Sequence, residues 1–201
     1  MQKILGLLLC LFIAQCTTKP KTTLVGDDRG IWQGKVLMTN LKTKNKKWAN
    51  VVWASDSSQD RMRVDVSAIF NVPVATFLKD GDQAHLWLFT EKKYYVSDSA
   101  ERLFQQLTKL DVDPAIFFSL LGTPQPPSTE WQCKDKSDVF GCVWKQKKVV
   151  LTVDHGDLDK RTIKVRRTGQ SLRLRLSRAK VEVPDRLFTP LKTSQFKTIQ
   201  L

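Results

Sequence analysis

Short runs of alternating apolar and polar residues occupy most of the chain beyond residue 29. In one run, Met62, Val64 and Val66 alternate with Arg63 and Asp65. Because successive side chains of a strand point to opposite faces, such a run predicts a strand with one buried face. Turn residues between the runs favour hairpins and therefore an antiparallel sheet. The predicted strands cover 31–38, 47–55, 62–69, 73–79, 84–89, 93–96, 148–154, 160–167, 171–178 and 180–183.

Two segments in the middle of the chain have the spacing of apolar residues that is typical of helices. The first, 99–110, can begin at Asp98, which has an acidic residue three positions later. The second, 113–121, has Asp113 as a possible cap and Pro114 at the first helical position. It is apolar nearly all round, so it must be covered on several sides or cover an apolar surface itself.

The N-terminus has a different pattern. Lys3 precedes an apolar run at 4–14, which suits a secretory signal and is shorter than the about 20 residues that span a bilayer. The run ends in Ile13-Ala14-Gln15-Cys16, which resembles the lipobox of bacterial lipoproteins. That resemblance implies cleavage before Cys16 and a covalent lipid on its sulfur. Gln15 departs from the small residue that the pattern prefers, so an ordinary signal cut nearby is the alternative.

We therefore expect a signal peptide at 1–15, a lipidated flexible tether at 16–29 and one domain at 30–201. Thr17 stands where an Asp would resemble an inner-membrane retention signal. This favours anchoring in the outer membrane, with the domain facing the periplasm.

Two cysteines remain once Cys10 leaves with the signal peptide and Cys16 carries lipid. Cys133 and Cys142 lie in strand-like arms around a polar turn, within 131–144, and the compartment is oxidising. The spacing predicts a structural disulfide that clips a hairpin. No further Cys or His at short spacing points to a zinc site, so we expect no metal.

The charge of the chain is strongly positive, with 33 Lys and Arg against 20 Asp and Glu. In a cytosolic protein this would suggest nucleic acid first, but the signal peptide argues against that partner. Many cations alternate along 160–180, which usually means one solvated face of neighbouring strands, with attraction to anionic headgroups as a secondary effect. This basic face comprises Lys160, Arg161, Lys164, Arg166, Arg167, Arg173, Arg175, Arg178 and Lys180.

Several short motifs follow one another along the chain: Trp32-Gln-Gly-Lys35, Arg63-Val-Asp-Val66, Ala68-Ile-Phe-Asn71, Phe77-Leu-Lys-Asp-Gly81, Tyr94-Tyr-Val96 and, at the end, Leu187-Phe-Thr-Pro190. Together with the two helices, their order resembles the LolA/LolB superfamily of lipoprotein carriers and receptors, and LolB-type outer-membrane lipoproteins in particular. The second half, with its cysteine hairpin, departs from the LolB pattern.

The resemblance implies a mainly β fold: an antiparallel, open half-barrel of about eleven strands with a short helical lid over an apolar cavity, consistent with the curling of large sheets. From pattern alone, a packed core is the favoured alternative to the cavity. The expected lining of the cavity is Val64, Val66, Val74, Leu86, Leu88, Phe104, Leu107, Phe117, Phe118, Leu120 and Leu121.

The family also implies an apolar loop between the third and fourth strands that enters the membrane, which here would be Ile69 and Phe70. The alternative is that these two residues end a core strand and pack under the helices. The implied function is to bind acyl chains and help insert lipoproteins into the outer membrane, with a soluble LolA-like carrier as a partner.

Catalytic motifs are not apparent in the sequence, so we expect a non-enzymatic protein without a cofactor other than its covalent lipid. We also expect it to be a monomer. His85 lies in an alternating strand, and His155 lies in a predicted turn at 154–157. Two other functions remain open: a carrier or sensor of another lipid, and a scaffold lipoprotein that binds envelope proteins through its basic face.

Overall fold

The computed structural model describes residues 29–110, 112–114, 116–121, 129–136, 138–157 and 159–201. The predicted signal peptide, lipid attachment at Cys16 and tether up to residue 28 lie outside the described residues. Arg29, expected as the last tether residue, belongs to the first strand. Within the described ranges, no helix is both long and apolar enough to cross a membrane.

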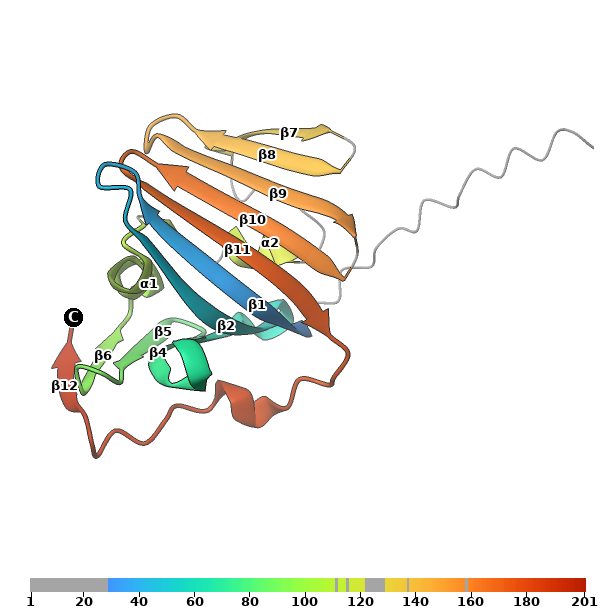
Figure 1. Cartoon of the computed structure of the whole chain (residues 1–201). Coiled ribbons are helices and arrows are strands. Elements are labelled where there is room, and N and C mark those ends of the chain that lie inside the picture. Colours follow the sequence, from blue (N-terminus) through green and yellow to red (C-terminus); the bar gives the residue numbers. More distant parts are fainter. Residues whose placement is uncertain (1–28, 111, 115, 122–128, 137, 158) are drawn as a thin grey trace, which may run out of the picture.

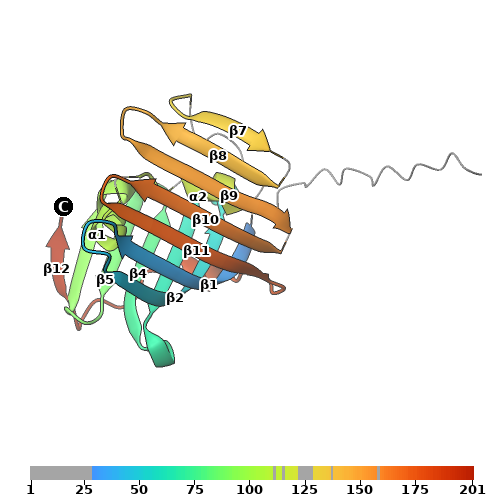
Figure 2. The same cartoon turned by 45° about the horizontal axis from the view of Figure 1, so that its top comes forward.

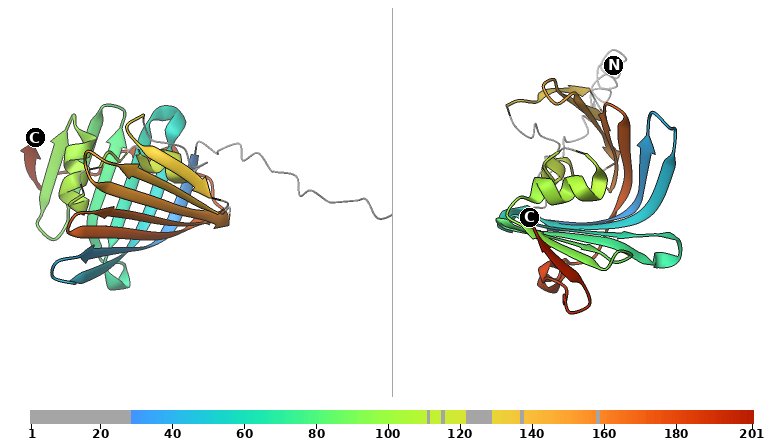
Figure 3. Two further views of the ribbon diagram at one scale, coloured as in Figure 1. Left: turned by 90° about the horizontal axis from the view of Figure 1, so that it is seen from above. Right: turned by 90° about the vertical axis from the view of Figure 1, so that its left-hand side faces the viewer.

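One sheet of 12 strands forms the scaffold, in the order β12-β6-β5-β4-β3-β2-β1-β11-β10-β9-β8-β7. It curls strongly, as Figures 1 and 3 show, and β7 and β12 remain at its two open edges. The predicted open half-barrel is confirmed, with 12 strands in place of about eleven. The strands are β1 (Arg29–Asn40), β2 (Lys46–Asp56), β3 (Arg61–Ser67), β4 (Pro73–Asp80), β5 (Gln83–Leu88), β6 (Lys93–Ser97), β7 (Gln132–Lys136), β8 (Val139–Trp144), β9 (Val149–Asp157), β10 (Lys160–Arg167), β11 (Gln170–Ala179) and β12 (Lys197–Gln200).

The two predicted helices form and lie in the hollow of the sheet (Figure 3). Helix α1 (Ala100–Thr108) is capped by Ser99, whose hydroxyl accepts a hydrogen bond from the backbone N–H of Arg102, so the predicted cap at Asp98 is wrong by one residue. Helix α2 (Ile116–Leu121) is shorter than predicted. The rings of Phe104 and Phe117 pack on each other, with centroids 5.5 Å apart.

The C-terminal segment departs from the sequence prediction. The stretch 180–183 is not a strand: Pro184 follows it and cannot donate to a sheet ladder, and Val181 is exposed. Beyond it, Phe188 is buried and the chain continues to β12, a strand absent from the predicted set, which pairs in parallel with β6. This segment closes a second apolar cluster on the convex face of the sheet, formed by Ala54, Leu78, Trp87, Tyr94, Val183 and Phe188.

The predicted disulfide is present. Cys133 and Cys142 are directly opposite each other in the β7–β8 hairpin, and their sulfurs are bonded. Figure 2 shows this hairpin at the edge of the curved wall that β7 to β11 build with β1. Because β7 has only one neighbouring strand, the bond fixes the edge strand β7 to β8, which in turn pairs with β9.

Candidate functional site

The loop between β3 and β4 presents an apolar surface to solvent. Its tip, a tight turn at Ile69–Asn71, leaves Ile69 74% exposed and Phe70 93% exposed, and Val72 beyond it is 55% exposed. The alternative interpretation, that Ile69 and Phe70 end a core strand and pack under the helices, is therefore wrong. We call Ile69, Phe70 and Val72 the apolar tip; its role at a membrane stays a prediction.

The backbone of the apolar tip is unusual. Phe70 has φ 64° and Asn71 has φ 59°, in the left-handed region that a bulky residue such as Phe rarely adopts. The loop is closed by a 2.9 Å hydrogen bond from the N–H of Ala68 to the carbonyl of Val72. A strained conformation that displays a large apolar side chain is the kind of outlier from which a functional role is inferred.

The residues expected to line an acyl cavity share the concave face of the sheet with α1 and α2. Six of them belong to one buried cluster, and four others pack against its margin. The side chain of Phe118 lies outside the described residues. The opening of this interior to an acyl chain stays a prediction. The buried members are Val64, Leu86, Phe104, Phe117, Leu120 and Leu121, and the marginal ones are Val66, Val74, Leu88 and Leu107.

The predicted basic face lies largely on the convex side of β10 and β11. Arg166 and Arg175 are exposed there, Arg173 is half-buried, and Arg175 is paired in register with Lys35 of β1. Arg178, at the end of β11, is half-buried and does not belong to this convex face, because it alternates in phase with Leu174 and Leu176 of the concave side.

Arg161 is an exception to this face. Its side chain is buried on the concave side, its guanidinium lies 5.5 Å from the centre of the Trp32 ring, and burial lowers its pKa. The expectation that it is solvated is wrong, because Arg161 alternates in phase with Ile163 and Val165, which face the apolar cluster.

The two histidines have structural surroundings. His85 is buried beside Tyr94, with 2.7 Å between its Nδ1 and the tyrosine hydroxyl, and burial lowers its pKa. His155 lies in β9, so the predicted turn at 154–157 is wrong. In the described part of the chain, no group of His, Cys, Asp or Glu side chains could hold a metal ion.

Charge is distributed unevenly between the two ends of the strands. Antiparallel order brings the β1–β2, β3–β4, β5–β6, β8–β9 and β10–β11 connections to one end, which we call the basic end. The apolar tip lies at this end. Its cations are Lys42, Lys44, Lys46, Lys47, Lys92, Lys93, Lys145, Lys147, Lys148, Arg166 and Arg167.

The opposite end carries acidic side chains and the start of the domain. There Asp56, which is buried, forms ion pairs with Arg29 at 3.3 Å and Arg61 at 3.0 Å, and Arg61 also pairs with Asp185 at 3.1 Å. Burial by itself raises the pKa of Asp56. Hydrogen bonds from Ser58 and Arg61, together with the charge of Arg29, outweigh it and hold the pKa below its usual 3.8.

Two neighbouring cavities open at the basic end, and most of the residues around them had no predicted role. The basic cavity, of about 650 Å³, is lined by Asn40, Lys42, Lys109, Gln146, Lys147, Lys148, Arg167, Thr168, Gly169 and Gln170. The mixed cavity, of about 370 Å³, is lined by Met38, Thr39, Asn40, Thr43, Asn45, Lys47, Leu107, Thr108, Lys109, Leu110, Gln170 and Ser171. These residues come from strand ends, turns and α1, so only the folded chain brings them together.

Comparison with protein-family models gives no match, and comparison with curated proteins gives none either. Among solved structures, the chain is similar to an uncharacterized conserved protein from Thermus thermophilus, with 8% sequence identity and a TM-score of 0.48 over 86% of this chain and 91% of that one. It is also similar to a LolA superfamily protein from Nitrosomonas europaea, with 12% identity and a TM-score of 0.42 over 81% of this chain and 90% of that one.

Proposed function

We propose that this protein is a lipoprotein of the outer membrane that binds acyl chains and helps insert other lipoproteins into that membrane. The observation that carries the proposal is the apolar tip, where Phe70 is 93% exposed in a strained conformation at the basic end of the sheet. Full burial of one Phe side chain in hydrocarbon is worth about 1.5–3 kcal/mol, which favours contact of this end of the domain with a bilayer to which the protein is already anchored.

The interior of the half-barrel supports the acyl-binding part of the proposal. The concave face is apolar, and α1 and α2 cover it without extending the sheet. Displacement of a helix would expose a surface suited to hydrocarbon, and each buried CH₂ contributes about 0.8 kcal/mol. Transfer from carrier to receptor to bilayer follows such differences in burial, so no catalytic step, metal or cofactor is required beyond the lipid proposed on Cys16.

Anchoring of Cys16 in the outer membrane would keep the domain at its target surface. The proposed tether joins the chain at Arg29, at the end of the sheet opposite the apolar tip. About 12 extended residues reach at most roughly 40 Å, which is comparable with the length of a strand such as β1. This reach allows the domain to lie along the membrane with its apolar tip in contact.

Reconstituted transfer tests this function. The full-length acylated protein is placed in vesicles, a fluorescent acylated lipoprotein is supplied from dilute micelles, and flotation measures its rate of incorporation. We expect the protein to raise this rate and Phe70→Asn to reduce the gain by roughly tenfold, because the tip loses about 1.4 kcal/mol or more of apolar burial. Asn is chosen because it tolerates a positive φ.

Val181→Asn is the matched control, since Val181 is exposed and lies at the opposite end of the sheet. If the wild-type protein left the rate of lipoprotein incorporation the same as in vesicles without it, the proposal would be overturned. Native mass spectrometry of the purified protein would then separate the alternatives. A free lipid adduct favours a carrier of another lipid. The absence of an adduct, together with salt-sensitive binding of envelope proteins, favours a scaffold.

A further inference from the structure

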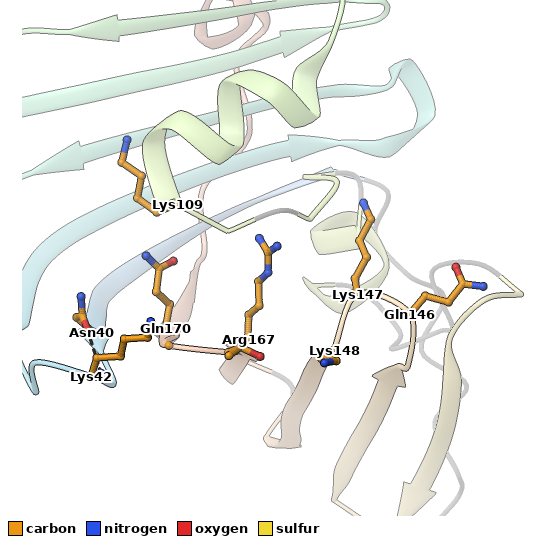
Figure 4. A pocket seen from close by; sticks show the side chains of 10 residues that line it. Asn40, Lys42, Lys109, Gln146, Lys147, Lys148, Arg167 and Gln170 are labelled. Carbon is orange, nitrogen blue, oxygen red and sulfur yellow. Dashed lines mark hydrogen bonds between the residues drawn. The ribbon is translucent and has the colours of Figure 1, made fainter.

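Cations from separate parts of the chain converge on the basic cavity. Lys42 comes from the β1–β2 turn, Lys109 from the end of α1, Lys147 and Lys148 from the β8–β9 turn, and Arg167 from the end of β10. Figure 4 shows the side chains of Lys109, Arg167 and Lys147 projecting to the same side. The lining residues include five cations and neither Asp nor Glu.

Much of this positive charge is not neutralised within the described part of the protein. Lys147 pairs with Glu101 at 2.9 Å and lies over the Trp144 ring. Lys42, Lys109 and Lys148, by contrast, have no carboxylate within ion-pair distance among the described residues. Like charges around one concavity repel each other, and a bound anion would relieve that repulsion.

Solvated lysines are the ordinary explanation of a basic turn, and Lys109 also suits the negative end of the α1 dipole. The cavity adds what scattered lysines lack. Asn40, Gln146 and Gln170 place amide groups among the cations, and such groups can donate hydrogen bonds to an anion's oxygens. Cations and amides around a concavity fit a compact oxyanion such as a phosphate group.

The mixed cavity gives the ligand a second property. It shares Asn40, Lys109 and Gln170 with the basic cavity, and its lining also includes the apolar residues Met38, Leu107 and Leu110. Leu110 belongs to the apolar cluster of the half-barrel, and Met38 and Leu107 pack against that cluster. A molecule that fills both cavities therefore has an anionic head, and its apolar part points toward the interior.

We infer that the two cavities form a site for a phosphate-bearing amphiphile: the phosphate lies in the basic cavity and the first part of the hydrocarbon in the mixed cavity. The two volumes lie within the range of small-molecule sites, roughly 300–1,000 Å³. The inference deepens the proposed lipid-binding function and rests on it for the hydrocarbon part. It adds a headgroup preference that an apolar interior alone would not produce.

Calorimetric titration of the full-length protein with short-chain phospholipids below their micelle concentration tests the site. We expect phosphatidylglycerol to bind at least roughly tenfold more tightly than phosphatidylcholine with the same chains. Phosphatidylglycerol has a net negative charge that can receive two or more charge-assisted hydrogen bonds, whereas the choline of phosphatidylcholine compensates its phosphate. Inorganic phosphate should compete only weakly, and the preference should decline as salt is raised.

Lys42→Gln/Lys148→Gln should abolish the preference, because the loss of two cations weakens binding of phosphatidylglycerol more than that of phosphatidylcholine, whose phosphate is compensated by choline. Lys35→Gln/Lys164→Gln removes the same charge from the convex face and should keep the preference. All four lysines are exposed, so the variants should fold, which circular dichroism checks.

Each contrary result has a separate meaning. Equal binding of the two lipids, or an equal loss of preference in both double variants, overturns the headgroup site and leaves acyl binding intact. Binding of inorganic phosphate as tight as that of phosphatidylglycerol overturns the amphiphilic site. Failure of both lipids to bind removes the proposed acyl-binding function together with the site.

Discussion

Single residues account for two features at opposite ends of the sheet. Phe70 combines a left-handed backbone with a side chain that is almost fully exposed, so stability alone gives no reason for a Phe at this position. Asp56 is buried and satisfied by Arg29 and Arg61, which joins the start of β1 to the β2–β3 turn. Asp185 brings the C-terminal segment into the same ion network.

Replacement of Asp56 by Asn should lower the free energy of unfolding at pH 7 by about 1.5 kcal/mol, because charge-assisted hydrogen bonds are lost. The pKa of Asp56 is below 3.8 in the folded protein, so its contribution is present above about pH 4 and is lost as the pH falls through the folded value. Urea unfolding at pH 7 and pH 3 should therefore show a smaller difference between wild type and variant at pH 3. A constant difference would contradict the assigned charge state.

Among the elements, the β1–β11 pairing closes the curved wall between the two halves of the chain. Gly34 lies opposite Leu176, and a Cβ at Gly34 would lie 1.9 Å from the carbonyl oxygen of Arg175. The lack of a side chain therefore permits the close approach of the two strands. Gly34 belongs to the motif Trp32-Gln-Gly-Lys35, but the sequence does not indicate why a glycine is needed there, because the strand that approaches it lies more than a hundred residues away.

Gly34→Ala should lower the melting temperature by several degrees, because the new methyl group meets backbone that cannot rotate away. About 2 kcal/mol is expected, in the range of overpacked positions. Gly81→Ala, at a turn with nothing within 4 Å of the added Cβ but with φ 56°, separates steric contact from backbone strain. If the two variants melted alike, close approach of β1 and β11 would not be the cause.

The whole molecule is polarised along its strands. Lysine-rich turns and the apolar tip gather at one end, while Asp56, Asp60, Asp82, Asp157 and Asp159 gather at the other, where the chain enters the domain. A bilayer with anionic headgroups would attract the basic end, and each nearby cation contributes up to about 1 kcal/mol at low salt. The orientation of the domain at such a bilayer would thus depend on the assembled sheet, which brings these charges to one end.

Binding of the protein to anionic vesicles should weaken steeply when salt is raised from about 0.05 to about 0.5 M, since the screening length shrinks from about 14 to about 4 Å. Lys44→Gln/Lys46→Gln, in the β1–β2 turn and at the start of β2, should reduce binding at low salt, as measured by co-sedimentation. Lys160→Gln/Lys180→Gln removes equal charge at the opposite end and should have little effect. Equal effects would show that net charge, and not its position, governs attraction.

The sequence by itself determined most of the local structure. Alternation and turn residues located the strands from β1 to β11, the cysteine hairpin included, and the cysteines paired as expected, because strand periodicity and residue chemistry are local properties. The missed elements depend on distant partners. The strand β12 exists because β6 offers a free edge, the segment 180–183 has no such neighbour, and Phe188 is buried by Trp87 and its cluster.

Only the tertiary structure decided how the candidate site is composed. Exposure of Phe70, burial of Arg161 and convergence of Lys42, Lys109 and Lys148 cannot be predicted from periodicity, since each depends on how the sheet curls and where α1 ends. Alternation assigns a side chain to one face of a strand, whereas curvature and long-range pairing decide whether that face meets solvent, a helix or another charge.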